Sequence, residues 1–129
     1  MAHRKSDPWP DLVMAMLSVN NYALAKTFEC FEGLSANAVF EPSNYTKWDG
    51  PEIARRLVKS GYDRGPVLTE MLGERLSSLK VLCDDVPSSE IRLSTGNRRE
   101  LIALFAKVQG VGPRVLDNFL LLRGSAAET

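Results

Sequence analysis

The sequence predicts an all-α fold, a compact bundle of about six helices that carries a helix-hairpin-helix element at its C-terminal end. Apolar residues recur at helical spacing along most of the chain, and no stretch alternates in the manner of a strand. With 44% apolar residues in a chain of 129, one core can be buried. We therefore expect a single domain over residues 1–124, followed by a short polar tail at residues 125–129.

The first two helices are expected on either side of a polar break at residues 18–21. Prolines and aspartates at residues 7–11 suit the start of a helix, and an apolar stripe follows over residues 12–17. A second helix is predicted over residues 22–32. Residues 34–49 contain proline, asparagine and Asp-Gly breakers, so a loop or short helical turns are predicted there.

Two longer helices are expected in the middle of the chain. The first begins near Pro51 and is stopped by Gly61, and the second begins near Pro66 and carries apolar residues as far as Leu79. Gly73 lies inside the second of these helices, where it costs about 1 kcal/mol relative to alanine. Either another segment packs closely against this glycine, or the helix is weak.

The last two helices are expected to flank a glycine turn. Residues 83–96 are polar and contain two aspartates and a proline, so they are predicted to form a connection with at most one turn of helix. A fifth helix is then predicted over residues 97–108, and a sixth from Pro113 to about Arg123.

The Gly-Val-Gly turn between these two helices is predicted to bind phosphate. Each glycine permits a positive φ angle or a close backbone approach, and the valine can fill the groove where the helices meet. Because Pro113 suits the first helical position, the amides of the first turn point outward without intrahelical partners. The helix dipole adds to their attraction for an oxyanion, and two neighbouring basic residues supplement it. The predicted binding residues at this turn are Lys107, Gly110, Val111, Gly112 and Arg114.

Regularly spaced phosphates are offered by duplex DNA, and contacts to them position a protein without reading sequence. The chain has 16 basic and 16 acidic residues and a formal net charge of zero, whereas nucleic-acid binders usually show a basic surplus. A net charge of zero does not exclude a local basic face on the surface. The simpler alternative is that Gly110 ends one helix and Pro113 starts the next in an ordinary helix pair.

We expect no cofactor, no metal and no membrane span. Cys30 and Cys83 stand far apart and cannot alone hold an iron-sulfur cluster, so buried and reduced thiols are expected. His3 is the only histidine, which argues against zinc and histidine-based catalysis. No apolar run reaches the roughly 20 residues that span a bilayer, and no apolar signal region follows the N-terminus. We therefore expect a soluble cytoplasmic protein, which would be nucleoid-associated if it binds DNA.

The hairpin VQGVGPRVLDNFLLL resembles that of the helix-hairpin-helix DNA glycosylases, the endonuclease III-like superfamily. Two further segments, DPWPDLVMAMLSVNNYALAKTF and LVKSGYDRGPVLTEMLGERL, are similar to the first conserved helix of the family and to its stretch of glycine, aromatic and basic residues. Their order and spacing agree over about residues 8–123. The resemblance implies the six-helix barrel domain of that superfamily, with the hairpin fixing the DNA backbone, and it allows a monovalent cation at the hairpin.

The resemblance also bears on individual positions. The glutamine that wedges into the duplex in the family falls at Asn20, a shorter residue that the resemblance makes a candidate probe of the DNA groove, together with Asn21 and Tyr22. The alternative is that Asn20 and Asn21 simply cap the second helix. The catalytic lysine of bifunctional members is replaced by Arg114, which stays protonated and cannot form a Schiff base. Leu116 stands where the family has a small alanine. The catalytic aspartate and the cysteine-rich loop that follow the hairpin in the family are not expected here, since the sequence ends at Thr129.

The sequence thus predicts a non-catalytic protein that binds duplex DNA weakly, with little sequence preference, and that senses damaged or distorted sites or anchors a partner protein. Two alternatives stay open. One is a glycosylase that takes its acid from an unconventional position, and the other is a protein-interaction module built on the same fold. The candidate acids for the glycosylase are Asp84, Asp85, Asp117 and Glu128.

Overall fold

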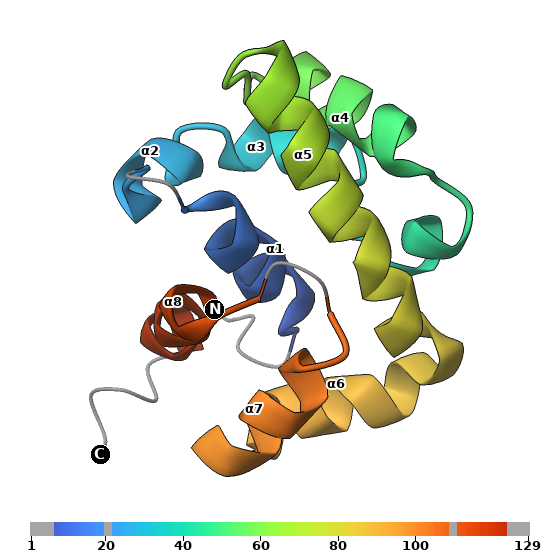
Figure 1. The fold of residues 1–129 in the computed structure, drawn as a ribbon, viewed down its shortest axis with the longest axis vertical. Coiled ribbons are helices and arrows are strands. Elements are labelled where there is room, and N and C mark those ends of the chain that lie inside the picture. Colours follow the sequence, from blue (N-terminus) through green and yellow to red (C-terminus); the bar gives the residue numbers. More distant parts are fainter. Residues whose placement is uncertain (1–6, 20–21, 109–110, 124–129) are drawn as a thin grey trace.

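The computed structural model describes residues 7–19, 22–108 and 111–123 of the chain. Within these ranges the protein is helical throughout and contains no strand, so the predicted all-α class is confirmed (Figure 1). The helices, in chain order, are α1 (Trp9–Leu17), α2 (Leu24–Phe28), α3 (Phe31–Ala36), the 3-10 helix η2 (Pro42–Thr46), α4 (Gly50–Lys59), α5 (Pro66–Ser77), the 3-10 helix η3 (Ser78–Asp85), α6 (Val86–Thr95), α7 (Arg98–Phe105) and α8 (Pro113–Arg123).

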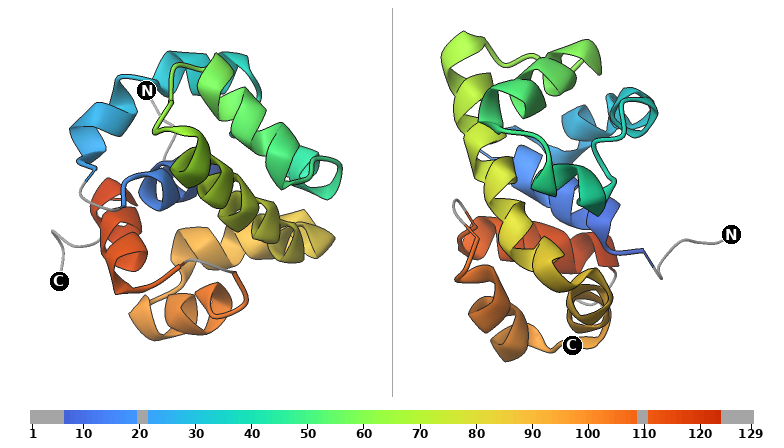
Figure 2. Two further views of the ribbon diagram at one scale, coloured as in Figure 1. Left: turned by 45° about the horizontal axis from the view of Figure 1, so that its top comes forward. Right: turned by 90° about the vertical axis from the view of Figure 1, so that its right-hand side faces the viewer.

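Helix α1 forms the centre of the molecule, with the other helices arranged around it (Figures 1 and 2). Seven of its nine residues are buried, and it packs against α2, α5 and α8. A helix that is apolar on nearly every side belongs in a core. The sequence between residues 9 and 17 therefore fixes both the position of α1 and the surfaces that its neighbours must cover.

Helices α4 and α5 form the most extensive pair in the fold. A Cβ atom built on Gly73 of α5 would lie 2.6 Å from the carbonyl oxygen of Gly50 and 3.0 Å from the amide nitrogen of Ala54, both in α4. The expectation that another segment packs closely against this glycine is therefore confirmed. The missing side chain lets the two backbones approach.

The predicted second helix, residues 22–32, is interrupted and forms α2 and α3. The hydroxyl oxygen of Thr27, in α2, lies 2.7 Å from that of Ser18, and Leu34, in α3, is fully buried. The break at residues 29–30 turns the chain so that both contacts are made. Apolar periodicity does not reveal this break, because both short helices contribute apolar residues.

Helix α6 lies where the sequence predicted a connection, so that prediction is wrong. The carboxylate of Asp85 accepts a hydrogen bond from the Ser88 amide at 3.2 Å and caps the helix. Pro87 occupies the first turn, where the missing N–H costs nothing. The aspartate and proline that were expected to prevent a helix here therefore mark its start. With this helix and the divided second helix, the described residues form eight α-helices rather than the predicted six.

The apolar core draws residues from every described helix except α2. Its largest fully buried side chains include Trp9, Tyr45, Tyr62 and Phe119. The indole nitrogen of Trp9 donates to a carboxylate oxygen of Glu90 at 2.8 Å, which ties α1 to α6. None of the helices in the described ranges has the length and apolar character needed to cross a membrane.

Candidate nucleic-acid interface

The hairpin begins where α7 ends, at Phe105, three residues earlier than the sequence predicted. The chain then turns, and the Val108 amide donates to the Phe105 carbonyl at 2.9 Å. Val108 is buried, whereas Lys107 is exposed. The turn therefore directs the predicted basic residue outward. Gly110, the first glycine of the predicted turn, lies outside the described residues.

Helix α8 exposes the beginning of its first turn to solvent, whereas Val115 and Leu116 are buried. Its first backbone hydrogen bond runs from the Leu116 amide to the Gly112 carbonyl at 3.1 Å. The amides of Arg114 and Val115 precede this bond, where helix geometry supplies no partner. Gly112, Pro113 and Arg114 are all exposed. The exposed part of this turn thus includes two of the predicted binding residues, Gly112 and Arg114.

Gly112 differs from the prediction in one respect. The prediction gave each glycine of the turn a positive φ or a close backbone approach, but positive φ occurs only at Gly61 and Gly65 among the described glycines. Apart from Gly112 and its two chain neighbours, no described residue has an atom within 4 Å of the position that a Cβ on Gly112 would occupy. The backbone conformation described here therefore does not require glycine at 112. The open space leaves the main chain accessible to a ligand.

Helices α7 and α8 are held together by one aromatic and one ionic contact. The rings of Phe105 and Phe119 meet edge to face with centroids 5.6 Å apart, and Arg98 pairs with Asp117 at 2.7 Å. A groove of about 450 Å³ lies between the two helices. Val111 is half-buried and lines it, together with residues that include Leu116, which is itself buried.

The loop between α1 and α2 carries Asn20, which lies outside the described residues. On its N-terminal side, three successive backbone carbonyls accept hydrogen bonds from distant side chains. The Tyr62 hydroxyl donates to Leu17, the Asn118 amide to Ser18 at 3.1 Å, and the Arg64 guanidinium to Val19 at 2.7 Å. The start of this loop is thereby fixed both to α8 and to the connection between α4 and α5.

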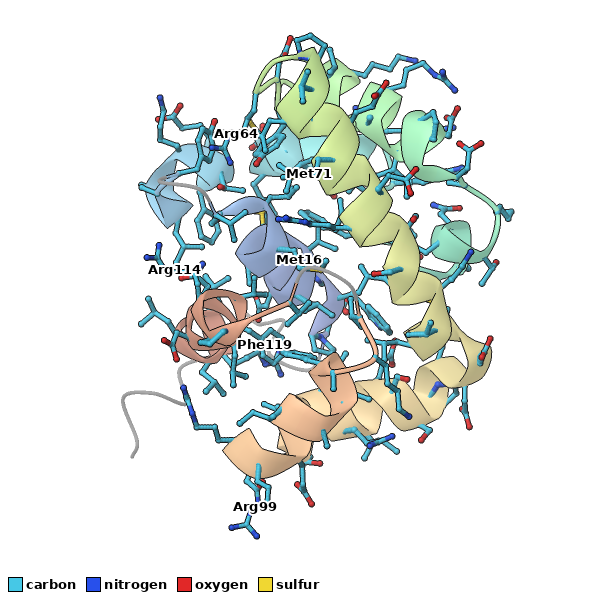
Figure 3. All side chains as sticks on the ribbon, viewed as in Figure 1. Met16, Arg64, Met71, Arg99, Arg114 and Phe119 are labelled. Atoms are coloured by element: carbon cyan, nitrogen blue, oxygen red, sulfur yellow. The ribbon has the colours of Figure 1, made fainter. Side chains whose placement is uncertain are left out.

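Two further cations lie at this loop. The Arg64 guanidinium lies 4.1 Å from the centre of the Tyr22 ring, and the Lys26 ammonium lies 5.8 Å from it. In Figure 3, Arg64 and Arg114 both project on the left-hand side of the view, whereas Arg99 projects from the lower end. The connection between α4 and α5 and the start of α8 therefore bring basic side chains to one side of the molecule.

Sequence reasoning named Tyr22 beside Asn20 but missed Arg64 and Asn118 as residues of this region. The only available signal was the basic residue between Gly61 and Gly65, in the segment that resembles the glycosylases. The hydrogen bonds to Ser18 and Val19 join residues 100 and 45 positions apart. Contacts over such separations leave no periodic trace in a sequence.

The hairpin helices carry a local excess of positive charge. Residues 98–123 contain five of the 16 basic residues and only two of the 16 acidic residues, so the rest of the chain is acidic overall. One of the two acids, Asp117, is paired with Arg98, and the other, Glu100, accepts a hydrogen bond from the Asn97 amide. The neutral total thus conceals a basic C-terminal region.

Of the candidate acids that the structure describes, Asp85 and Asp117 are engaged, whereas Asp84 is exposed near the end of η3. Asp117 is in the ion pair with Arg98, and Asp85 caps α6. Glu128 lies outside the described residues. Among the residues that the structure describes, no three histidine, cysteine or acidic side chains gather in a way that could hold a metal ion.

The two cysteines are free and buried, which confirms that prediction. Burial raises the pKa of the Cys83 thiol to about 11, and burial also raises that of Cys30. Since the thiolate is the nucleophile, neither thiol is activated for attack at neutral pH.

No protein-family model, curated protein or solved structure matches this chain. The likeness to the glycosylases therefore rests on the three sequence segments alone.

Proposed function

We propose that the protein binds the phosphate backbone of duplex DNA through the start of α8, without reading sequence. The observation that carries this proposal is the open surface at Gly112. Unpaired amides precede the first hydrogen bond of α8, and no protein atom blocks the approach to the glycine. Amides at a helix start, aided by the helix dipole, are suited to an oxyanion.

Charge supports the same proposal. Arg114 stands in the exposed first turn of α8, and Lys107 stands exposed on the other side of the turn. Neither forms an ion pair within the described ranges. Both side chains are therefore available to a phosphate, and the basic excess of residues 98–123 strengthens their field.

The α1–α2 loop extends the proposed surface. Asn118 ties Ser18, at the start of this loop, to α8, and the cations Arg64 and Lys26 lie at the Tyr22 ring on the other side of the loop. We assign Asn20 the role of a probe of the DNA groove and Lys26 that of a second phosphate contact. Recognition of distorted or damaged sites follows if the loop enters the duplex there.

The chemistry of the hairpin favours binding over base excision by a Schiff-base route. Arg114 occupies the position at which the resembling enzymes carry a catalytic lysine, and a guanidinium remains protonated. Asp117, the acid nearest in sequence, already neutralises Arg98. The residues at the hairpin are thus suited to hold a strand rather than to attack it.

The proposal is tested by fluorescence anisotropy with a labelled duplex of about 20 base pairs over a range of salt concentrations. Phosphate contacts predict that log affinity falls linearly with log salt, with a slope of about −0.9 for each neutralised phosphate. We expect Arg114→Glu to weaken binding at least about tenfold and Arg114→Gln to reduce the magnitude of the slope by about one. Gly112→Ala should also weaken binding, because its Cβ would enter the open space.

Arg99→Glu is the matched control, since it makes the same charge change in α7 at a side chain that projects elsewhere (Figure 3). It should alter affinity much less than Arg114→Glu. Equal losses for the two variants would point to a general charge effect and would refute the site. Release of a base from a panel of damaged duplexes by the purified protein would instead support the glycosylase alternative.

A further inference from the structure

The groove between α7 and α8 has a lining that phosphate binding does not use. Its floor includes the buried side chains of Phe105 and Leu116, and Val111 forms part of its wall. Ile102 of α7 also lines it and is 54% exposed. The groove measures about 450 Å³ and is mostly apolar. A DNA backbone offers no apolar group that would cover this surface.

Basic side chains lie on both sides of the turn that borders this apolar groove. Lys107 follows α7 and is exposed, and Arg114 is exposed in the first turn of α8. Both acidic side chains of residues 98–123 have partners within the protein. Asp117 forms an ion pair with Arg98, and Glu100 accepts a hydrogen bond from the Asn97 backbone amide. A partner seated in the groove would therefore meet an apolar floor and a basic rim.

We propose that the groove docks one amphipathic helix of a protein partner, with an apolar stripe flanked by acidic residues. An apolar groove between two helices is a common receptor for the apolar face of a third helix, which it anchors at positions i, i+3, i+4 and i+7. Acidic residues beside that stripe complement Lys107 and Arg114, which favours this class of helix over a basic one.

The partner helix and DNA would compete for the hairpin. Gly112 and Pro113 line the groove and also belong to the proposed phosphate site. A helix seated there would place its acidic flank against Arg114, where the DNA strand is proposed to lie. The acidic partner would thus act as an inhibitor of DNA binding. The docking proposal itself does not depend on DNA binding, since its apolar anchor is Ile102.

The probe for this proposal is a synthetic peptide of about 16 residues, long enough to have helical tendency, with leucines at i, i+3, i+4 and i+7 and glutamates on either side. The matched peptide carries lysine in place of each glutamate. Binding is followed by amide chemical shifts of the full chain. We expect the acidic peptide to shift signals of residues that line the groove, and the basic peptide to bind at least about tenfold more weakly.

Ile102→Gln removes the exposed apolar anchor without changing charge and should weaken acidic-peptide binding at least about tenfold. Ile91→Gln is its matched control, because Ile91 is 64% exposed on α6 and does not line the groove. DNA affinity should be unchanged in both variants, which separates a failure of this proposal from a failure of the phosphate site.

Three results would overturn the docking proposal. The first is that the acidic peptide shifts no groove signals, and the second is that Ile102→Gln binds it as well as the parent chain does. The third is concentration-dependent self-association of the parent protein that Ile102→Gln abolishes, since the groove would then receive a second copy of this chain. Displacement of labelled duplex by the acidic peptide, but not by the basic one, would support the predicted competition.

Discussion

The side-chain amide of Asn118, in α8, donates a hydrogen bond to the carbonyl oxygen of Ser18 at 3.1 Å. The two residues lie 100 positions apart, and the bond satisfies a carbonyl at the end of α1 that helix geometry leaves without a partner. It also ties the hairpin helix to the start of the α1–α2 loop. The two parts of the proposed DNA surface are therefore held in register by one side chain.

Replacement of Asn118 tests this relationship. Asn118→Ala should lower the free energy of unfolding by about 1–2 kcal/mol, because a partly buried carbonyl loses its donor. Asn118→Asp should cost more at neutral pH, because a carboxylate would face the Ser18 carbonyl, and the excess should shrink near pH 3. Urea unfolding at the two pH values measures both effects. If the aspartate variant had the same free energy of unfolding as the parent protein at neutral pH, the hydrogen bond would not contribute to stability.

Close packing at Gly73 reverses the usual effect of a helix substitution. Helix propensity alone predicts that Gly73→Ala stabilises the protein by about 1 kcal/mol. The structure predicts the opposite, since the new Cβ would lie 2.6 Å from the Gly50 carbonyl oxygen. Overpacking of this kind typically costs about 1–3 kcal/mol, which should appear as a lower midpoint in urea unfolding.

Gly112→Ala is the control for this packing prediction. Beyond its two chain neighbours, no described residue has an atom within 4 Å of its Cβ position, so we expect a change of no more than about 0.5 kcal/mol. A stabilised Gly73→Ala variant would show that α4 and α5 do not approach as closely as described. The same Gly112→Ala protein, being folded, serves the DNA-binding measurement.

The sequence predicted those helices whose signals are local. The starts of α1, α4, α5 and α8 follow from apolar stripes that begin at proline, and the end of α4 is marked by Gly61. The sequence-based prediction failed at α6, because it assigned Asp85 and Pro87 to a loop, whereas Asp85 caps this helix and Pro87 lies in its first turn. The same residue types serve both purposes, and only the packing of the following turn decides between them.

The candidate site was predictable only in part, for the same reason. The sequence motif around the hairpin is local, and both basic residues that flank it, Lys107 and Arg114, are exposed as that motif predicts. The contact of Arg64 with Val19 depends on the tertiary fold. The apolar groove beside Ile102 also depends on the tertiary fold. It lies between α7 and α8, which contact each other through Phe105 and Phe119.

Ala38 is a site at which glycine should be better than the present residue. It follows the end of α3 with φ of 62°, in the left-handed region that side chains rarely adopt. The Val39 amide donates to the Leu34 carbonyl at 3.0 Å, which closes the helix around this conformation. Ala38→Gly should therefore stabilise the protein by about 0.5–1 kcal/mol, after allowance for the greater entropy of glycine in the unfolded chain.

The opposite substitution, Gly61→Ala after the end of α4, is the control for Ala38→Gly. Gly61 has φ of 98°, and a Cβ there would meet only the Cys30 sulfur, at 4.0 Å. Backbone strain is thus the main consequence of Gly61→Ala, which should cost about 1 kcal/mol. Thermal or urea unfolding of the two variants should give changes of opposite sign. Two changes of the same sign would contradict the role assigned to the left-handed conformation.

The stability of the protein should fall in alkaline solution through the ionisation of Tyr62. Burial raises the pKa of this phenol from 10 to about 12, and the neighbouring Arg64 guanidinium opposes the shift only in part. The folded state therefore holds the proton more tightly than the unfolded state does. Its contribution is fully present below pH 10 and is lost as the pH rises from 10 to 12.

Tyr62→Phe isolates this contribution from that of Tyr45, whose pKa is also raised by burial. Near pH 8 the variant should be less stable by about 1 kcal/mol, because the hydrogen bond from the Tyr62 hydroxyl to the Leu17 carbonyl is lost. Above pH 10 the difference between the two proteins should narrow, since phenylalanine cannot ionise. Urea unfolding at intervals between pH 8 and pH 11 measures this difference, and a constant gap would show that Tyr62 ionises equally easily in the folded and unfolded chains.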